Sequence, residues 1–292
     1  MMKTSKMRRM LPYVVLWVFL SLTALVWLLA DNFNRANAQE RYQYRTDQIA
    51  SAITKRMEDY ATVLRGGAAL FDASEGDVTR DEWRIYIEHL DIGDAFPGIQ
   101  GVGFSKYIKP AELAQHIQQI RAEGFPDYTV RPKGERDEYT SIIYLEPFDA
   151  RNQRAFGYDM FSEPVRRTAM ARARDTDTVA ISGKVTLVQE TEQDVQAGFL
   201  MYIPTYTHGV PQNSVAERRA ALHGYVYSPF RVKNLIRGIF PAPLDDIDFE
   251  IFDGAKPISS TLMYDSDESG RSLEKKDPSL FSSRKIIDST FR

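Results

Sequence analysis

Asp159 is the residue whose type and position best suit ligand recognition in this chain. It follows Tyr158 and precedes Met160 and Phe161, between a predicted strand at residues 140–145 and a predicted helix. A carboxylate placed there can point into a cavity beside a sheet and accept hydrogen bonds from N–H groups of a ligand. The alternative is that Asp159 binds backbone N–H groups of its own loop, as aspartates in turns commonly do. Position alone favours that alternative.

No group of residues in the sequence has the spacing of a catalytic or metal-binding site. No Gly-x-Ser-x-Gly sequence provides a nucleophile elbow, and Gly101-Val102-Gly103 lacks the third glycine of a nucleotide-binding loop. The histidines are too scattered for a metal motif: His89, His116, His208 and His223. We therefore expect no enzyme activity, no catalytic residue, no metal and no cofactor in this chain.

The composition fits an exported globular protein. The chain has 292 residues, no cysteine and a formal net charge of −3, without a basic stripe that would indicate a nucleic-acid partner. A chain of this length can build a core without disulfides. The 16 phenylalanines and 15 tyrosines predict an aromatic-lined interior or pocket.

One segment predicts a membrane crossing. Residues 11–30 carry no charge. A helix needs about 20 such residues to span a bilayer, so this segment is long enough. The basic residues before it hold the N-terminal tail, residues 1–10, in the cytoplasm. We expect a single-pass protein of the inner (plasma) membrane, with residues 31–292 in the periplasm or outside the cell. A cleaved signal peptide ending near Ala36-Asn37-Ala38 is the alternative, which the length of the apolar run disfavours.

A long helix is expected to follow the membrane segment, over residues 31–75. The segment lacks proline, and apolar residues recur at helical spacing: Ile49, Ile53, Tyr60, Leu64 and Phe71. This stripe can pack on its own domain or on a second copy of the chain. The first is the simpler interpretation, because most amphipathic helices face a core.

The remaining sequence predicts an α+β fold with two lobes. Thr79 and Glu82 form a capping box that opens a helix. A later helix begins at Pro164, with a buried stripe that includes Val165 and Ala169. The predicted strands are residues 128–131, 140–145, 178–181, 185–189 and 199–206. We expect an antiparallel sheet with helices on one side.

The two lobes have predicted boundaries. The outer lobe spans residues 76–206, a polar linker spans 207–218, and a second, membrane-proximal lobe spans 219–292. Weak strands at residues 262–264 and 285–287 fall in the second lobe. No closing apolar segment follows them, so the second lobe is expected to be truncated.

Several sequence blocks resemble the CHASE domain, an extracytoplasmic sensory module of bacterial and plant receptors. The blocks are FPGIQGVGF from Phe96, YLEP from Tyr144, GYDM from Gly157, SEP from Ser162, ARARDT from Ala171, GFL from Gly198 and PTY from Pro204. Their order and number make the resemblance specific. It implies a long membrane-proximal helix and two PAS-like lobes, with the ligand pocket in the outer lobe.

The resemblance also implies site residues. The plant cytokinin receptors are members of this family, and their adenine-contacting aspartate falls on Asp159. Two of their threonines fall on Ser182 and Tyr202, and Met160 and Leu200 in the matching blocks complete the expected ligand-binding set. Because the large ring of Tyr202 replaces a threonine, we expect a smaller or differently shaped ligand than cytokinin.

The function expected from this resemblance is sensing. A small molecule would bind the outer lobe of a homodimer, and the stalk and membrane helices would pass the signal to a cytoplasmic output domain. That domain would be a histidine kinase of a two-component system, or a nucleotide or diguanylate cyclase. The sequence contains neither a second membrane helix nor this output domain, so the chain is expected to be a fragment. The alternative is a membrane-anchored protein-interaction module without a small ligand.

Overall fold

A computed structural model gives the structure of the chain. It describes residues 4–74, 77–191, 194–242, 244 and 247–267. The described residues divide into two units between Ser51 and Ala52, and each unit is considered by itself. The predicted α+β class is confirmed: an antiparallel sheet is combined with helices.

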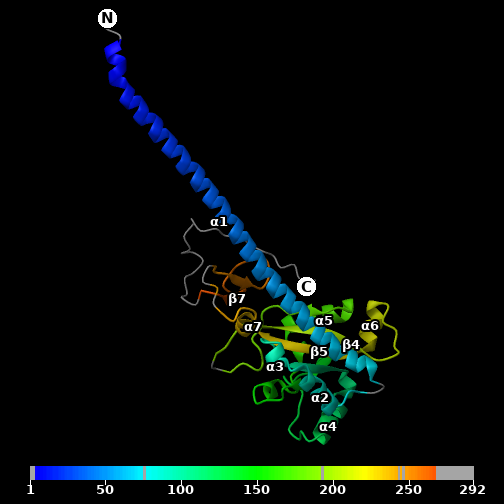
Figure 1. Cartoon of the computed structure of the whole chain (residues 1–292). Helices are drawn as coiled ribbons and strands as arrows, with labels where there is room; N and C mark the ends of the chain where they lie inside the picture. The colour runs from blue at the N-terminus through cyan, green and yellow to red at the C-terminus, as the bar shows by residue number, and fades with distance from the viewer. Residues whose placement is uncertain (1–3, 75–76, 192–193, 243, 245–246, 268–292) are drawn as a thin grey trace. The chain divides into compact units, whose positions relative to one another are not determined.

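Helix α1 runs without a break from Thr4 to Ala73 (Figure 1). Among the described residues it is the one helix long and apolar enough to cross a membrane, with a window of mean hydropathy 2.3 that is not buried at all. Side chains such as Leu16 and Phe19 are more than half exposed. An apolar surface of this length suits lipid rather than water, as expected for residues 11–30.

The second unit is built on a five-stranded, PAS-like antiparallel sheet with the strand order β2-β1-β5-β4-β3. The strands are β1 (Val102–Ile108), β2 (Tyr139–Glu146), β3 (Ala180–Ile181), β4 (Gly198–Tyr206) and β5 (Leu222–Arg231). The predicted strands at residues 128–131 and 185–189 are only isolated bridges, at Arg131 and Val185. The loops that contain these two bridges therefore lie beside the sheet but add no strand to it.

The first core lies where the C-terminal part of α1 and helix α2 (Arg80–Leu90) cover one face of the sheet. The ring of Phe71 stacks on Phe104 at 4.1 Å, and Trp83 is fully buried beside them. A Cβ on Gly67 would lie 3.1 Å from Val226, so this glycine lets α1 approach the central strand. The predicted stripe of α1 therefore packs on its own domain.

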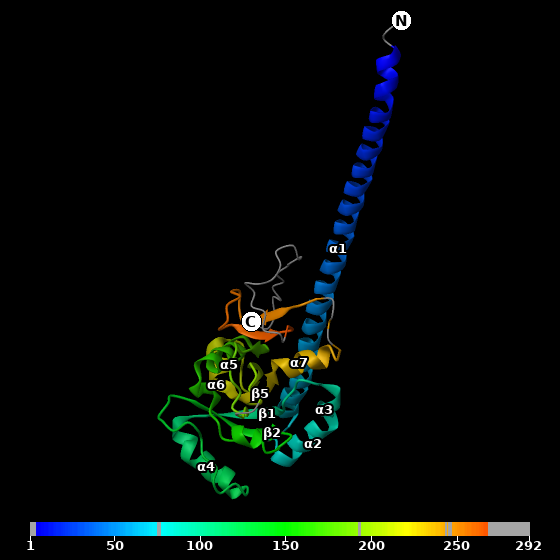
Figure 2. The ribbon, with the colours of Figure 1, turned by 90° about the vertical axis from the view of Figure 1, so that its left-hand side faces the viewer.

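The second core lies on the opposite face of the sheet. It is covered by the short helices η2 (Asn152–Ala155) and η3 (Met160–Ser162) and by α5 (Pro164–Thr176). Figure 2 shows α5 and α6 on one side of the strands and α2 and α3 on the other. The expectation of helices on one side only is therefore wrong. All nine residues of β4 are buried, and such two-sided burial removes the polar alternation that marks a solvent-facing sheet.

The boundary predicted between the lobes also needs correction. Strand β5, assigned from sequence to the second lobe, is the central strand of the first sheet, between β1 and β4. The predicted linker overlaps the first four residues of helix α6 (Val215–Ala221). A capping box of Ser214 and Glu217 begins this helix. The sequence did not reveal strand order, and the polar composition of residues 207–218 hid the helix.

The remaining elements flank the sheet. They are α3 (Ile92–Ala95), η1 (Pro110–Glu112), α4 (Leu113–Ala122), α7 (Val232–Ile239), β6 (Glu250–Phe252) and β7 (Leu262–Asp265). Strands β6 and β7 pair with each other in a separate two-stranded sheet, where the second lobe was expected. Residues 268–292, which include the predicted strand at 285–287, lie outside the described residues.

Candidate functional site

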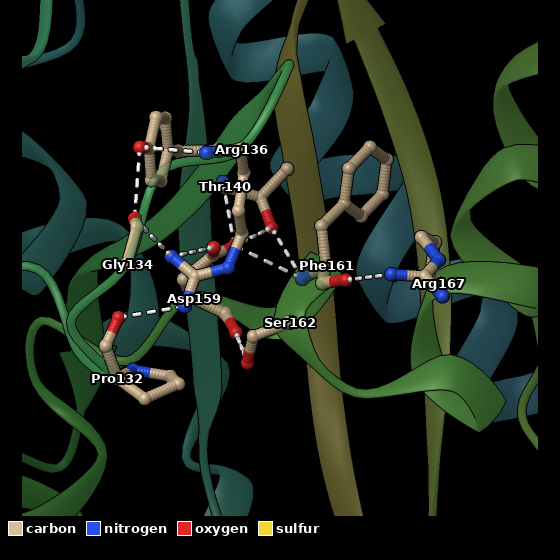
Figure 3. A network of polar contacts seen from close by, with 9 residues as sticks. Pro132, Gly134, Arg136, Thr140, Asp159, Phe161, Ser162 and Arg167 are labelled. Atoms are coloured by element: carbon tan, nitrogen blue, oxygen red, sulfur yellow. Dashed lines mark hydrogen bonds and ion pairs between the residues drawn. The ribbon is translucent and has the colours of Figure 1, made fainter. Parts of the chain in front are cut away.

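Asp159 lies at the start of η3, beside strand β2, and is completely buried. Its Oδ1 accepts hydrogen bonds from the backbone N–H of Thr140 at 2.9 Å, from the Thr140 hydroxyl at 3.2 Å and from the N–H of Phe161 at 3.0 Å (Figure 3). This oxygen therefore joins the loop to the sheet, which is the backbone-binding role considered from the sequence.

The second carboxylate oxygen of Asp159 has different surroundings. Oδ2 is buried and has no hydrogen-bond partner among the described residues, although Nη1 of Arg136 lies 3.4 Å away. Arg136 is itself held by the carbonyls of Pro132 and Gly134. Burial raises the pKa of Asp159, while the N–H of Thr140 and the charge of Arg136 act in the opposite direction. Oδ2 is thus an acceptor with capacity left for a ligand donor.

Met160 and Tyr202 meet in the second core. The Tyr202 hydroxyl lies 3.7 Å from the Met160 sulfur, and both side chains are at most 1% exposed. The Tyr202 ring neighbours those of Tyr225 and Tyr227, with centroids 6.3 and 6.4 Å away. The hydroxyls of Tyr225 and Tyr227 are buried without a hydrogen-bond partner among the described residues. Burial raises the pKa of all three hydroxyls, so they remain neutral potential donors.

Ser182 and Leu200 form a second pair of predicted site residues. The Ser182 hydroxyl donates to the carbonyl of Gly183 at 2.8 Å and accepts from the N–H of Leu200 at 2.9 Å. The N–H of Ser182 also donates to the Leu200 carbonyl. These contacts hold β3 against β4, so the hydroxyl is already engaged; its ligand role stays a prediction.

The sequence did not point to several residues of this region. Tyr225 and Tyr227 were missed because β5 was assigned to the other lobe, although their two-residue spacing places both on one face of a strand. Arg166 was missed because the predicted stripe of α5 included Val165. The structure instead leaves Val165 38% exposed and buries Arg166 to 3% exposure. No hydrophobic pattern signals a buried arginine.

A surface groove lies elsewhere in the same unit. Its volume is about 380 Å³. Lys184, Gln196, Met263 and Tyr264 are among the residues that line it, between the loop before β4 and strand β7. It contains none of the predicted site residues, and a ligand there would contact the edge of the sheet instead of the second core.

Sequence comparison matches residues 76–264 to the CHASE domain. The chain belongs to the CHASE domain family. The match includes the whole five-stranded sheet, the second core and Asp159, so the residues that were expected to bind ligand all fall inside the CHASE domain. CHASE domains are extracytoplasmic sensory modules, which fits a preceding helix that is long and apolar enough to cross a membrane.

Comparison with other proteins gave two further results. No curated protein matches the sequence. Among solved structures, the ligand-binding domain of an amino acid chemoreceptor from Pseudomonas aeruginosa PAO1, in complex with GABA, aligns with a TM-score of 0.43 and 12% identity over 75% of this chain and 76% of that one. An extracellular ligand-binding receptor from Desulfohalobium retbaense DSM5692 aligns with a TM-score of 0.42 and 11% identity over 75% of this chain and 31% of that one.

Proposed function

We propose that this CHASE domain is the ligand sensor of a transmembrane receptor and that a small molecule binds in the second core, between the sheet and α5. The observation that carries the proposal is the unused hydrogen-bonding capacity buried there. Oδ2 of Asp159 and the hydroxyls of Tyr225 and Tyr227 have no hydrogen-bond partner among the described residues, although Oδ2 forms an ion pair with Arg136 at 3.4 Å. Buried polar groups are normally paired, and each unpaired group costs about 1–3 kcal/mol.

Ligand entry requires the side chains of the second core to rearrange. Met160 and Tyr202 fill the space beside η3. Methionine is flexible and tolerates repacking, so Met160 is the side chain expected to move. A ligand that replaces its contacts would shift the domain toward the open arrangement by its differential affinity for the two arrangements.

Strand β5 supplies a physical route from this site to α1. Tyr225 and Tyr227 face the second core, whereas Val226, between them, faces α1 at Gly67. Phe230, on the same strand, stacks on Tyr60 of α1 at 5.0 Å. A displacement of β5 by ligand would therefore act directly on α1, because densely packed cores transmit strain.

The proposal extends to the receptor as a whole. The N-terminus would be cytoplasmic and the CHASE domain would lie outside the inner membrane. Two copies would pair, and their membrane helices would control a histidine kinase or a nucleotide or diguanylate cyclase. The basic residues before the apolar segment support this orientation.

Calorimetry with the full chain in detergent and a library of metabolites tests ligand binding. Asp159→Asn is the sharpest variant, because its amide oxygen can still accept from Thr140 and Phe161 while its NH₂ group replaces Oδ2. Asp149→Asn is the matched control, since Asp149 also accepts from a backbone N–H at the start of a short helix, that of Asn152 at 2.7 Å.

We expect Asp159→Asn to weaken the affinity for any ligand that binds by at least about tenfold, the effect of losing one buried charge-assisted hydrogen bond. Asp149→Asn should leave affinity unchanged. Equal affinities in wild type and Asp159→Asn contradict the placement of the ligand at Asp159. A chain that binds a protein but no metabolite would instead be an interaction module.

A further inference from the structure

Arg166 is a buried arginine on the face of α5 that meets the second core. It is only 3% exposed, a burial that arginine rarely reaches without an acidic partner. One guanidinium nitrogen, Nη2, donates to the carbonyl of Thr186 at 3.0 Å, and the guanidinium carbon lies 5.0 Å from the centre of the Tyr158 ring. Nε is buried and has no acceptor among the described residues. The group therefore keeps donor capacity inside the protein.

No carboxylate compensates this charge within ion-pair distance in the part of the chain that the structure describes. Glu163, one turn earlier, uses its carboxylate to accept from the backbone N–H groups of Val165 and Arg166. Asp159 faces Arg136 instead. By contrast, the buried Arg231 is paired with Glu190 at 2.7 Å. An uncompensated buried charge reduces the stability of the folded state, so a role in stability does not explain why Arg166 is buried.

Tyr202 and Tyr227 occupy the same region as Arg166. The guanidinium carbon of Arg166 lies 5.0 Å from the centre of the Tyr158 ring, and Tyr158 packs against the second core, which contains Tyr202 and Tyr227. In agreement with this placement, burial raises the pKa of both hydroxyls and the positive charge of Arg166 opposes that rise. Among the described residues the Tyr227 hydroxyl has no hydrogen-bond partner, and the Tyr202 hydroxyl has only the Met160 sulfur. One cation and two neutral donors are therefore available together, with few acceptors for them.

We infer that the second core binds the anionic group of the ligand, a carboxylate or a phosphate, through the guanidinium of Arg166 and the hydroxyls of Tyr202 and Tyr227. The inference rests on the ligand-binding function proposed above and adds the chemical class of the ligand. A guanidinium presents a planar set of donors that matches a carboxylate or a phosphate. The bound anion also forms an ion pair with the buried guanidinium and so compensates its charge.

The stability of the unliganded full chain gives the first test. Replacing an uncompensated buried cation by an apolar side chain of similar length removes a desolvation cost. Arg166→Met should therefore raise the midpoint of thermal unfolding, by about 2–4 °C. Arg167→Met is the matched control on the same helix, because Arg167 is exposed and its Nη1 donates to the Phe161 carbonyl at 2.9 Å. We expect its midpoint to stay unchanged or fall slightly.

Anion selectivity gives the second test, with the same three proteins at constant ionic strength. The probes are benzoate, succinate and inorganic phosphate, and the neutral analogues are benzamide and succinamide. At least one anion should raise the unfolding midpoint of wild type and Arg167→Met, while its neutral analogue does not. The shift should disappear in Arg166→Met. Any anion that binds with measurable affinity should bind that variant at least about thirtyfold more weakly. A carboxylate response and a phosphate response distinguish the two ligand sources.

Four results would overturn the inference. An anion could stabilise Arg166→Met as much as wild type, or wild type could respond equally to anions and amides. Alternatively, Arg166→Met could destabilise the unliganded chain while no anion stabilises wild type. A neutral ligand whose affinity falls in Asp159→Asn but not in Arg166→Met would leave the sensor function standing and remove only the anionic class.

Discussion

The two faces of the sheet differ in the hydrogen bonding of their buried tyrosine hydroxyls. In the first core, against α1, the Tyr144 hydroxyl donates to the Val78 carbonyl at 2.8 Å, and Tyr60 donates to the carbonyl of Pro97. In the second core, against α5, the Tyr206 hydroxyl donates to the Arg174 carbonyl at 2.7 Å, but the hydroxyls of Tyr225 and Tyr227 have no hydrogen-bond partner among the described residues. The same strands supply both cores, so the difference comes from what covers them.

This difference indicates different roles: the first core packs α1 on the sheet, and the second core is the face that we propose binds a ligand. Aromatic stacking and satisfied hydroxyls let the first core hold α1 to the sheet. The second core keeps unpaired donors and the buried charge of Arg166, which lowers stability in the absence of a ligand. Sensor domains need a region that a ligand can stabilise, and we propose the second core as that region.

The largest effect that we expect is in the first core. Trp83→Ala should reduce the free energy of unfolding by about 3–5 kcal/mol, because it leaves a large cavity between α1 and the sheet. Ile85→Ala is the control, since Ile85 lies on the same helix but is 46% exposed. Denaturant unfolding of the full chain measures both. A loss below about 1 kcal/mol for Trp83→Ala would mean that the first core does not hold α1 to the sheet.

The first core should also be sensitive to acid. His116 is buried, its Nε2 lies 2.8 Å from the Tyr128 hydroxyl, and burial together with the charge of Lys106 lowers its pKa from 6.5 to about 4. The unfolded chain therefore binds this proton more readily, and stability falls as the pH decreases from 6.5 to 4, by on the order of 3 kcal/mol.

Unfolding free energies of wild type and His116→Gln across this pH range isolate the contribution of His116. The wild type should lose stability more steeply than the variant between pH 6.5 and 4, and the two should run parallel at higher pH. Parallel curves over the whole range would show that His116 is not held neutral by the fold.

The smallest effect compares the two cores directly. Tyr144→Phe removes a satisfied hydrogen bond and should cost about 1 kcal/mol, whereas Tyr227→Phe removes an unpaired hydroxyl and should be neutral or stabilise by up to about 1 kcal/mol. Both substitutions delete the same atom from a buried ring. Equal losses in the two variants would mean that the Tyr227 hydroxyl is satisfied in solution, and the contrast between the cores would disappear.

Local features of this fold could be predicted from the sequence. The capping box at Thr79 and Glu82 forms as expected at the start of α2, and the stripe of α1 that includes Leu64 faces a core. Asp159 lies between a strand and a helix, as its neighbours indicated. Such features depend on residues close in the chain, and periodicity and capping report them directly.

Non-local features could not be predicted in this way. The central position of β5 depends on pairing with β1 and β4, which no local pattern encodes. On α5 the structure buries Arg166 and exposes Val165, the reverse of the prediction. Tertiary contacts decide this, whereas helical periodicity assigns apolar residues to the core. The different surroundings of the two Asp159 oxygens depend on Thr140, which donates to Oδ1, and on Arg136, which forms an ion pair with Oδ2. Both residues are distant in sequence from the η3 helix.

Hydrogen–deuterium exchange of the full chain, with and without a ligand found by calorimetry, tests the location of the binding site most directly. The account predicts protection in peptides that cover residues 156–176, 198–206 and 222–231, where η3, α5, β4 and β5 enclose the second core. Protection confined to residues 184–197 and 262–265, which line the surface groove, would contradict it.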